Sequence, residues 1–335
     1  MKGSNLEQLR MKTNCTNSYT PHRSNNLIIS SSSNLTFPEI KRLVSQNVTI
    51  LNEERKPYCN VQLIDQSVRE LQDAFRIAKA FRRLPLKSLR DQIIPIIIQI
   101  CHIHEIGHIY ATMAKRDAYT YTHCVGVTMI TRIIGICQGL SEEELKELTI
   151  CAFLHDIGKI KVPLEVLHKS GKLSSMEFEE MKKHSKYGYD LLRRIPGISE
   201  RTALVALQHH EREDGSGYPS GIKGDRIETF SKIVAIADVF HAMISKRSYK
   251  ASIPLFEVLR VMSEDAHDKF DSTLSVHFFQ IVMEWLIGNR VLLTNGTVGE
   301  IMDIHSYDPI HPVIEVNGKP IDLSRKTELD IEAIL

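Results

Sequence analysis

Histidines and aspartates that suit metal binding cluster in the middle of this chain. Fifteen histidines occur among the 335 residues, and seven of them lie between His123 and His241. Imidazole nitrogens and carboxylate oxygens are good ligands for first-row metals such as iron and manganese. Seven residues are candidate ligands: His123, His155, Asp156, His184, His209, His210 and Asp238. This number is enough for two ions that keep positions open for water and substrate, so the pattern predicts a two-metal site.

His155 and Asp156 are neighbours within the apolar run AFLHDIGKI, which we expect to be helical. A buried carboxylate is costly unless positive charge meets it, and a divalent cation would supply that charge. Because a carboxylate has two oxygens, Asp156 is the candidate bridge between two ions. A structural His-Asp hydrogen bond would be the better interpretation if the pair stood alone. The five further candidate ligands favour the metal site.

These residues belong to a longer set of motifs, H…HDIGK…H…HHExxDGSGYP…D, which runs from His123 to Asp238. The set resembles the HD-GYP family within the HD superfamily of metal-dependent phosphohydrolases, and the resemblance covers roughly residues 110 to 285. It implies an all-helical HD-type bundle with an iron or manganese cluster. It also implies hydrolysis of the bacterial second messenger cyclic di-GMP, first to linear pGpG and often onward to GMP.

The same resemblance implies a role for each residue. The ligands of one ion would be His123, His155, Asp156 and Asp238, with Asp156 bridging to a second ion held by His184, His209 and His210. Lys159, one turn beyond His155, would act with Asp156 in catalysis by stabilising charge on the scissile phosphate; the alternative is a solvated lysine at a helix end. Arg247 and Lys250 match positions that contact the nucleotide.

Two residues depart from the family pattern. Tyr119 lies four residues before His123, where members with three metals have Glu, and a phenol is a poor substitute for that ligand. We therefore expect two ions. His241 stands where many members have Asp, which puts the rate or the choice of metal in question. All seven ligands and Lys159 are present, so the chain is not interpreted as a degenerate copy.

The glycine-rich loop after His210 admits two interpretations. Its residues Gly217, Tyr218 and Pro219 form the GYP motif. Glycine permits tight turns and close backbone approach, which suits either a wall of the substrate cleft or a surface that docks a protein partner. The sequence does not separate these two roles.

Two other functions compete with hydrolysis of a cyclic dinucleotide. One is a zinc metallopeptidase, because His104, Glu105 and His108 match the H-E-x-x-H motif; three fixed letters often match by accident, and a third ligand is unidentified. The other is a signalling module that binds a cyclic dinucleotide, or a partner through the GYP loop, without cleaving anything. Hydrolysis of cyclic di-GMP on loading with metal would separate both from the enzyme.

The elements that must position these residues are mainly helical. We expect a flexible N-terminus over residues 1–26, a small α/β element over 27–60, a linker and helices over 61–109, a catalytic bundle over 110–286 and a C-terminal β module over 287–335. The β module is predicted from two Asn-Gly pairs, Asn295-Gly296 and Asn317-Gly318, each between strand-like runs. Apolar residues from Ile64 to Phe81 recur at helical spacing, which indicates a helix packed on its own domain or, as a second interpretation, a homodimeric coil.

The charge composition argues against nucleic acid or an anionic membrane as a binding partner. The 42 Lys and Arg residues nearly balance the 41 Asp and Glu residues, so the chain lacks the bulk basic charge that attracts nucleic acid or an anionic membrane. No segment reaches the roughly 18 apolar residues of a membrane span, and the N-terminus lacks a secretion signal. We therefore expect a soluble, cytoplasmic protein whose six cysteines, without a C-x-x-C pair, are reduced thiols.

Overall fold

The computed structural model describes residues 28–30, 49–51, 57–101, 120–169, 171–245, 255–266, 268–325 and 328–334. Contacts divide the chain into two compact units, residues 1–62 and 63–335. Among the described residues, no helix combines the length and the apolar character needed to cross a membrane.

The first unit contains two short strands that pair in parallel. β1 (Ile28–Ser30) and β2 (Thr49–Leu51) are in register, with Ile29 opposite Ile50. Parallel pairing is typical of α/β structure, which agrees with the predicted small α/β element over residues 27–60. The residues between the two strands lie outside the described residues.

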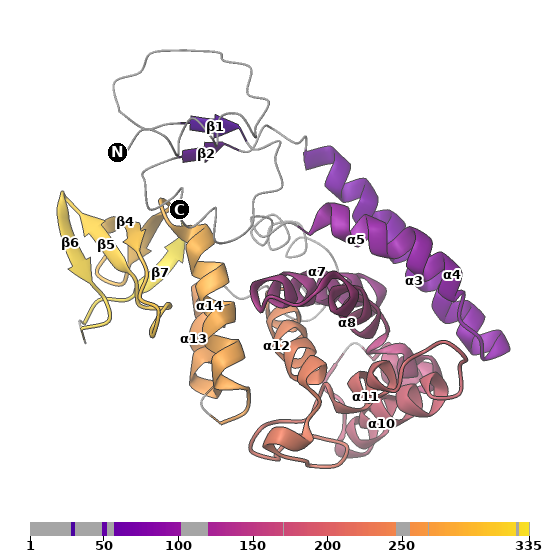
Figure 1. Ribbon diagram of the computed structural model, residues 1–335. Helices are drawn as coiled ribbons and strands as arrows, with labels where there is room; N and C mark the ends of the chain where they lie inside the picture. Colours follow the sequence, from indigo (N-terminus) through magenta and orange to yellow (C-terminus); the bar gives the residue numbers. More distant parts are fainter. Residues whose placement is uncertain are drawn as a thin grey trace. The chain divides into compact units, whose positions relative to one another are not determined.

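The second unit is built mainly from helices, as predicted (Figure 1). In chain order they are α3 (Pro57–Phe81, which begins in the first unit), α4 (Leu86–Ser88), the π-helical turn η1 (Leu89–Ile93), α5 (Ile94–Ile100), α7 (Thr120–Cys137), α8 (Glu142–Leu154), the 3-10 turn η3 (Ile157–Lys161), α9 (Leu164–Leu167), α10 (Ser175–Leu192), α11 (Glu200–Gln208), the 3-10 turn η4 (Gly224–Arg226), α12 (Thr229–Ile244), α13 (Leu255–Ala266) and α14 (Ser272–Leu286).

α7 is the central helix of the bundle. Every residue from His123 to Gly135 is buried, and the helix packs against α8 on one side and α12 on another. A helix that is apolar around its whole circumference must be covered on all sides. α7 therefore carries His123 in the interior rather than at the surface.

Two helices that frame the site begin at capping boxes. Ser141 starts α8: its hydroxyl accepts a hydrogen bond from the Glu144 amide, and the Glu144 carboxylate accepts one from the Ser141 amide. Ser174 and Glu177 form the same reciprocal pair at α10. Each box satisfies two amides that a helix start would otherwise leave unpaired, so both helices have defined starting points.

The prediction that one helix supplies both His155 and Asp156 is wrong. α8 ends at Leu154, His155 is its cap, and Asp156 leads into η3. The reason is the close packing of Gly158 on α10, where an added Cβ would lie 1.9 Å from the His184 carbonyl oxygen and 2.5 Å from the Gly188 amide nitrogen. The 3-10 turn brings the backbone of residue 158 onto α10, and with it the His155-Asp156 pair.

The helix α3 buries the predicted face against its own unit. Ile64, Leu71, Phe75 and Ala78 belong to the hydrophobic core, which agrees with the interpretation of a helix packed on its own domain. Phe81 departs from the prediction, since it is 71% exposed. It is the last residue of α3, where the helical face no longer meets the core.

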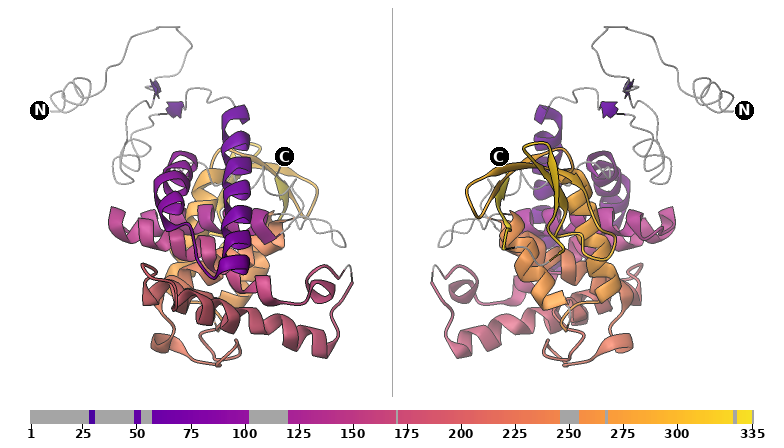
Figure 2. Two further views of the ribbon diagram at one scale, coloured as in Figure 1. Left: turned by 90° about the vertical axis from the view of Figure 1, so that its right-hand side faces the viewer. Right: turned by 90° about the vertical axis from the view of Figure 1, so that its left-hand side faces the viewer.

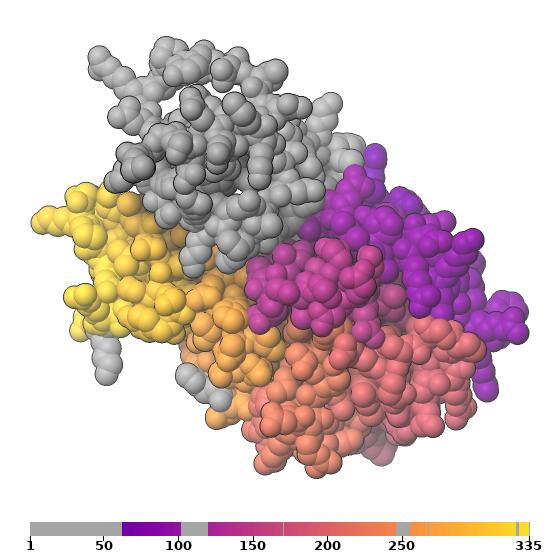
Figure 3. Space-filling view, in the orientation of Figure 1, coloured from indigo at the N-terminus to yellow at the C-terminus, as the bar shows by residue number. Residues whose placement is uncertain are grey.

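The C-terminal module is a five-stranded antiparallel sheet in the order β6-β5-β4-β3-β7. Its strands are β3 (Arg290–Leu293), β4 (Val298–Asp303), β5 (Val313–Val316), β6 (Lys319–Asp322) and β7 (Ile331–Ile334). In both views of Figure 2 the sheet lies beside α13 and α14, and β7 contacts α13. On the face shown in Figure 3, the surface of the module continues into that of these two helices.

Both predicted Asn-Gly turns are present, with different geometry. Asn317 and Gly318 both have positive φ, at 52° and 75°, as a two-residue hairpin turn requires. In the other turn only Gly296 has positive φ, at 80°, and the Asn295 side chain accepts a hydrogen bond from the Thr297 amide. The predicted small β module is confirmed.

The substitution Gly158→Ala tests the packing of η3 on α10. The new methyl group has no room beside the α10 backbone, so we expect a loss of about 2–3 kcal/mol in the free energy of unfolding, measured by urea denaturation. Gly171→Ala is the matched control, because a Cβ there meets no atom within 4 Å. Equal stability of the two variants would contradict the proposed contact.

Candidate metal centre

Three of the predicted ligands have their imidazole rings held in one orientation by the backbone. The Nδ1–H of His155 donates to the Ala152 carbonyl at 2.6 Å. His184 Nδ1–H donates to Met181 at 2.8 Å, and His209 Nδ1–H donates to Val205 at 3.1 Å. In each neutral ring the proton is therefore on Nδ1, which leaves a lone pair on Nε2. Fixing the tautomer through the other nitrogen is how proteins orient histidine ligands of metals.

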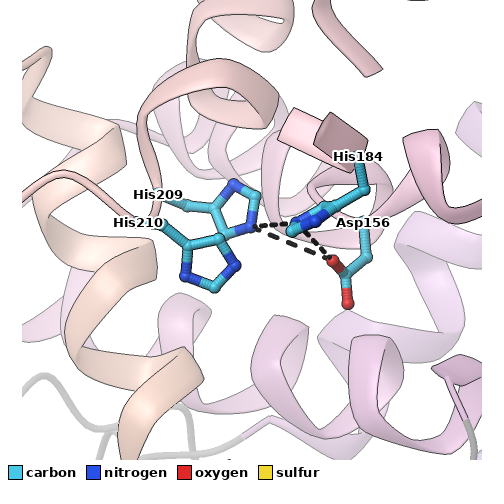
Figure 4. A group of neighbouring side chains, drawn as sticks. All are labelled: Asp156, His184, His209 and His210. Atoms are coloured by element: carbon cyan, nitrogen blue, oxygen red, sulfur yellow. Dashed lines mark hydrogen bonds and ion pairs between the residues drawn. The ribbon is translucent and has the colours of Figure 1, made fainter. Parts of the chain in front are cut away.

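These three Nε2 atoms point toward the Asp156 carboxylate (Figure 4 shows His184 and His209). His184 Nε2 lies 3.3 Å and His209 Nε2 3.9 Å from Asp156 Oδ1, whereas His155 Nε2 lies 3.4 Å from Oδ2. All four side chains are almost fully buried. Among the described residues, neither His155 Nε2 nor Asp156 Oδ1 has a hydrogen-bond partner.

The contact between His184 and His209 also indicates that a cation belongs at this site. Their Nε2 atoms are 3.3 Å apart, and both Nδ1 protons are committed to the backbone. The two neutral rings therefore present only lone pairs at Nε2, both to each other and to the Asp156 carboxylate oxygen. Such an arrangement is unfavourable unless a positive group stands between them. The donor set fits a divalent cation.

The remaining predicted ligands complete the other side of the cluster. His123 Nε2 lies 2.8 Å from Asp238 Oδ1 and 4.0 Å from Asp156 Oδ2. His210 Nδ1 lies 3.7 Å from Asp238 Oδ2. α12 supplies Asp238, and His210 directly follows His209, the cap of α11. The structure thus brings all seven sequence-predicted ligands together from α7, the α8–η3 junction, α10, the end of α11, and α12.

Two groups of donor atoms lie close enough to hold an ion. The first is Asp156, His184, His209 and His210, and the second is His123, His155 and Asp156; within each, the donor atoms lie within 4.8 Å of one another. Asp156 is common to both. Its ligand atoms therefore stand where a bridging carboxylate is needed, although ligation itself remains a prediction for all seven residues.

Burial and charge act together on the ionisable groups. Burial alone would raise the pKa of Asp156, but the Lys159 ammonium and the His155 imidazole hold that pKa well below its ordinary value. Burial lowers the pKa of His184 to about 4 and that of His209 to about 3. The carboxylate is therefore ionised and these two rings are neutral near pH 7, which are the forms that bind metal.

Lys159 lies beside the carboxylate rather than one α-helical turn beyond His155. It is carried by η3, and its Nζ donates to Asp156 Oδ2 at 2.5 Å. The side chain is 21% exposed, so it reaches from the buried cluster to the edge of solvent. An ammonium in this position stands beside the cluster of predicted ligands. Its predicted catalytic role stays a prediction.

The GYP loop packs against the same cluster. The Tyr218 amide donates to the His210 carbonyl at 3.2 Å, and the Tyr218 ring stacks on the His210 ring with centroids 4.6 Å apart. A Cβ at Gly217 would lie 2.4 Å from the His210 carbonyl oxygen, so this close approach requires glycine. These contacts place the loop directly against the predicted ligands and are compatible with both interpretations, a wall of the substrate cleft and a docking surface.

Several predicted residues lie outside the described residues. They are the substrate-binding candidates Arg247 and Lys250, the peptidase candidates His104, Glu105 and His108, and Tyr119. Their assignments stay predictions.

Two contacts at the site went unrecognised in the sequence. The buried carboxylate of Glu211 accepts a hydrogen bond from the Ser220 amide at 2.7 Å, which ties the GYP loop to the end of α11. The sequence signal that could have indicated this role is the position of Glu211 directly after His209 and His210. The second contact joins His241 to His123, with Nδ1 atoms 3.0 Å apart. No local pattern connects these two residues.

The lowered histidine pKa values predict how the stability of the metal-free protein depends on pH. His184 and His209 stay neutral in the folded protein, whereas the unfolded chain takes up protons below about pH 6.5. Stability should therefore fall as pH drops from 6.5 toward 4, by about 2 kcal/mol per histidine at pH 5. The raised pKa of His155 opposes this effect, and the lowered pKa of His210 adds to it.

Urea unfolding of metal-stripped protein at pH 7, 6 and 5 measures this dependence. His184→Gln should flatten the slope, because it removes one of the two buried neutral rings. A stability that does not change over this range would contradict the assignment of neutral, buried rings.

Comparison with known proteins agrees with the motifs. A family model described as an HD domain matches residues 105–274, half of the chain. The cyclic di-GMP phosphodiesterase response regulator RpfG of Xanthomonas campestris is 45% identical over 139 residues, which cover 40% of this chain and 36% of that relative. The 3'3'-cGAMP-specific phosphodiesterase 1 of Vibrio cholerae is 37% identical over 175 residues, which cover 51% and 40%.

A solved structure supports the fold. Bd1817, an HDG"Y"P protein from Bdellovibrio bacteriovorus, matches with a TM-score of 0.52 at 17% identity, over 66% of this chain and 70% of that one. The predicted HD-type bundle is therefore confirmed. The chain spans about two fifths of the length of the two phosphodiesterases above. Together with the family model, these matches bear out the resemblance drawn from the motifs: the chain belongs to the HD domain family.

Proposed function

We propose that this chain is a metal-dependent phosphodiesterase that hydrolyses cyclic di-GMP to pGpG, GMP or both. One observation carries the proposal: the lone pairs of two oriented, neutral imidazoles, those of His184 and His209, face a buried oxygen of Asp156 that lacks a hydrogen-bond donor among the described residues. This arrangement suits cation binding, and the HD family to which the chain belongs supports a phosphohydrolase.

The ligand atoms suit two ions, and we propose iron or manganese. His184, His209 and His210 would hold one ion and His123, His155 and Asp238 the other, with Asp156 between them. When bound, a pair of divalent ions supplies an activated water nucleophile and neutralises phosphate oxygens during in-line displacement. Mixed imidazole and carboxylate ligands suit these metals.

The protein's own side chains would position the substrate around this cluster. The Lys159 ammonium, at the partly exposed end of the cluster, is the candidate to stabilise charge on the phosphate. Tyr218 and the loop that carries it, stacked on His210, would exclude water from one side. Arg247 and Lys250 are proposed to contact the nucleotide.

Cyclic di-GMP is the first substrate to test, with a second cyclic dinucleotide beside it. RpfG is named for action on cyclic di-GMP, and the Vibrio relative is named for 3'3'-cGAMP. Both substrates carry the phosphodiester that the cluster would attack and differ in one base. A partner for the GYP loop and a homodimer are further proposals that this substrate test does not address.

The direct test incubates protein loaded with Fe(II) or Mn(II), under reducing conditions, with each dinucleotide and follows pGpG and GMP by chromatography. Asp156→Asn should lower turnover by about a thousandfold or more, because both ions lose their shared ligand. The control Asp190→Asn changes a partly exposed carboxylate on α10 that pairs with Lys186, and should retain full activity.

Three outcomes would contradict the proposal or its site. Binding without any product would favour a non-catalytic signalling module. Product formation that survives Asp156→Asn would reject the assigned centre. Zinc-dependent peptidase activity lost in His104→Ala, without dinucleotide hydrolysis, would favour the metallopeptidase.

A separate variant tests the role of Lys159. Lys159→Met removes the ammonium and should lower kcat by about 100- to 1,000-fold, while metal content stays at the wild-type level because no ligand atom is lost. Lys161→Met, on the same 3-10 turn but directed at the Tyr187 ring, is the matched control. Unchanged kcat, or loss of metal together with activity, would exclude the proposed role in charge stabilisation.

A further inference from the structure

His241 is a buried imidazole one helical turn beyond Asp238 on α12. Its Nδ1 lies 3.0 Å from Nδ1 of His123, and the two ring centroids are 5.0 Å apart in an edge-to-face arrangement. His241 belongs to neither group of predicted ligand atoms. It therefore touches the metal cluster through His123.

His123 differs from the other oriented histidines in the hydrogen-bond partner of its Nδ1 atom. His155, His184 and His209 each donate Nδ1–H to a carbonyl of their own helix, and this fixes their tautomer without another side chain. The described partner of His123 Nδ1 is the side chain of His241. A carbonyl only accepts a hydrogen bond, whereas an imidazole nitrogen either donates or accepts.

The proton positions of the two rings are therefore linked. Without an ion, His123 Nε2–H donates to Asp238 Oδ1 at 2.8 Å, so His123 Nδ1 accepts and His241 Nδ1 must carry the proton that it donates. If His123 Nε2 ligates an ion, its proton must be on Nδ1. His241 Nδ1 then has to accept, and the proton of His241 moves to Nε2.

The surroundings of His241 accommodate both arrangements. Ser245 Oγ lies 3.2 Å from Nδ1 and 3.5 Å from Nε2 of His241, so its hydroxyl is near either nitrogen. On the facing helix α7, a Cβ at Gly126 would lie 2.0 Å from His241 Nε2. The absence of a side chain at residue 126 provides the space for this imidazole beside His123.

We propose that His241 is a positioning residue that accepts the Nδ1–H bond of His123 and so directs the Nε2 lone pair of His123 toward the ion. Two ring protons are present before and after ion binding. The Nδ1 proton of His241 passes along the hydrogen bond to His123 Nδ1, His123 Nε2 gives up its proton to solvent, and His241 Nε2 takes one proton up from solvent, so each ring carries one proton before and after. The inference rests on the proposed metal centre and deepens it.

Mn(II) binding to the full chain tests the role directly. Free Mn(II), measured by electron paramagnetic resonance during titration, gives the affinity of each site without an activity assay. His241→Leu removes the acceptor and should weaken one of two Mn(II) sites by about 10- to 100-fold. The matched variant His241→Asn keeps an amide oxygen near the position of Nδ1 and should retain both sites within about threefold of wild type, a far smaller loss than that of a missing partner.

A second measurement is made on the wild-type chain, and a variant is needed only to assign its signals. Long-range 1H–15N NMR of ¹⁵N-histidine-labelled protein, with and without diamagnetic Zn(II), reports which nitrogen of each ring carries the proton. We expect His123 and His241 to exchange tautomers as described. Their signals are assigned with His241→Asn.

The outcomes separate the two proposals. A wild-type protein that binds no metal would reject the metal centre itself. Two intact Mn(II) sites in folded His241→Leu, or an unchanged His241 tautomer on Zn(II) binding, would overturn the role of His241 and leave the centre standing.

Discussion

The buried carboxylate of Asp156 is the constraint around which the bundle is arranged. A charge so far from solvent requires opposite charge nearby. Lys159 supplies one cation at Oδ2, but Oδ1 faces His184 and His209, which present lone pairs and are neutral near pH 7. α7, α10, the end of α11 and α12 each bring a donor atom toward the same small volume. A bound cation is the simplest way to satisfy them together.

Close backbone packing makes that convergence possible. Gly158 seats η3 directly on α10, and Gly217 brings the GYP loop onto the backbone of His210. In both places a Cβ would clash with the facing backbone and force the two elements apart. The capping boxes of α8 and α10 fix where the helices start. Precision at the cluster therefore rests on small residues and helix ends as well as on the ligands.

The residues that cluster were predictable from sequence, whereas their mutual contacts were not. Seven histidines and aspartates with the HD-GYP spacing predicted the residues that the fold brings together, because motif and helical period are local signals. The end of α8 at Leu154 depends on contact with Gly188, more than 30 residues away. The contact of His241 with His123 depends on how α12 crosses α7. Long-range packing of this kind leaves no local pattern.

The most direct measurement of the central claim is anomalous diffraction from crystals of the Mn(II)-loaded chain. We predict two manganese peaks on either side of Asp156, with one carboxylate oxygen directed to each. One peak should lie beside His184, His209 and His210, and the other beside His123, His155 and Asp238. A single peak, or peaks that Asp156 does not join, would contradict the account of a bridged two-metal centre.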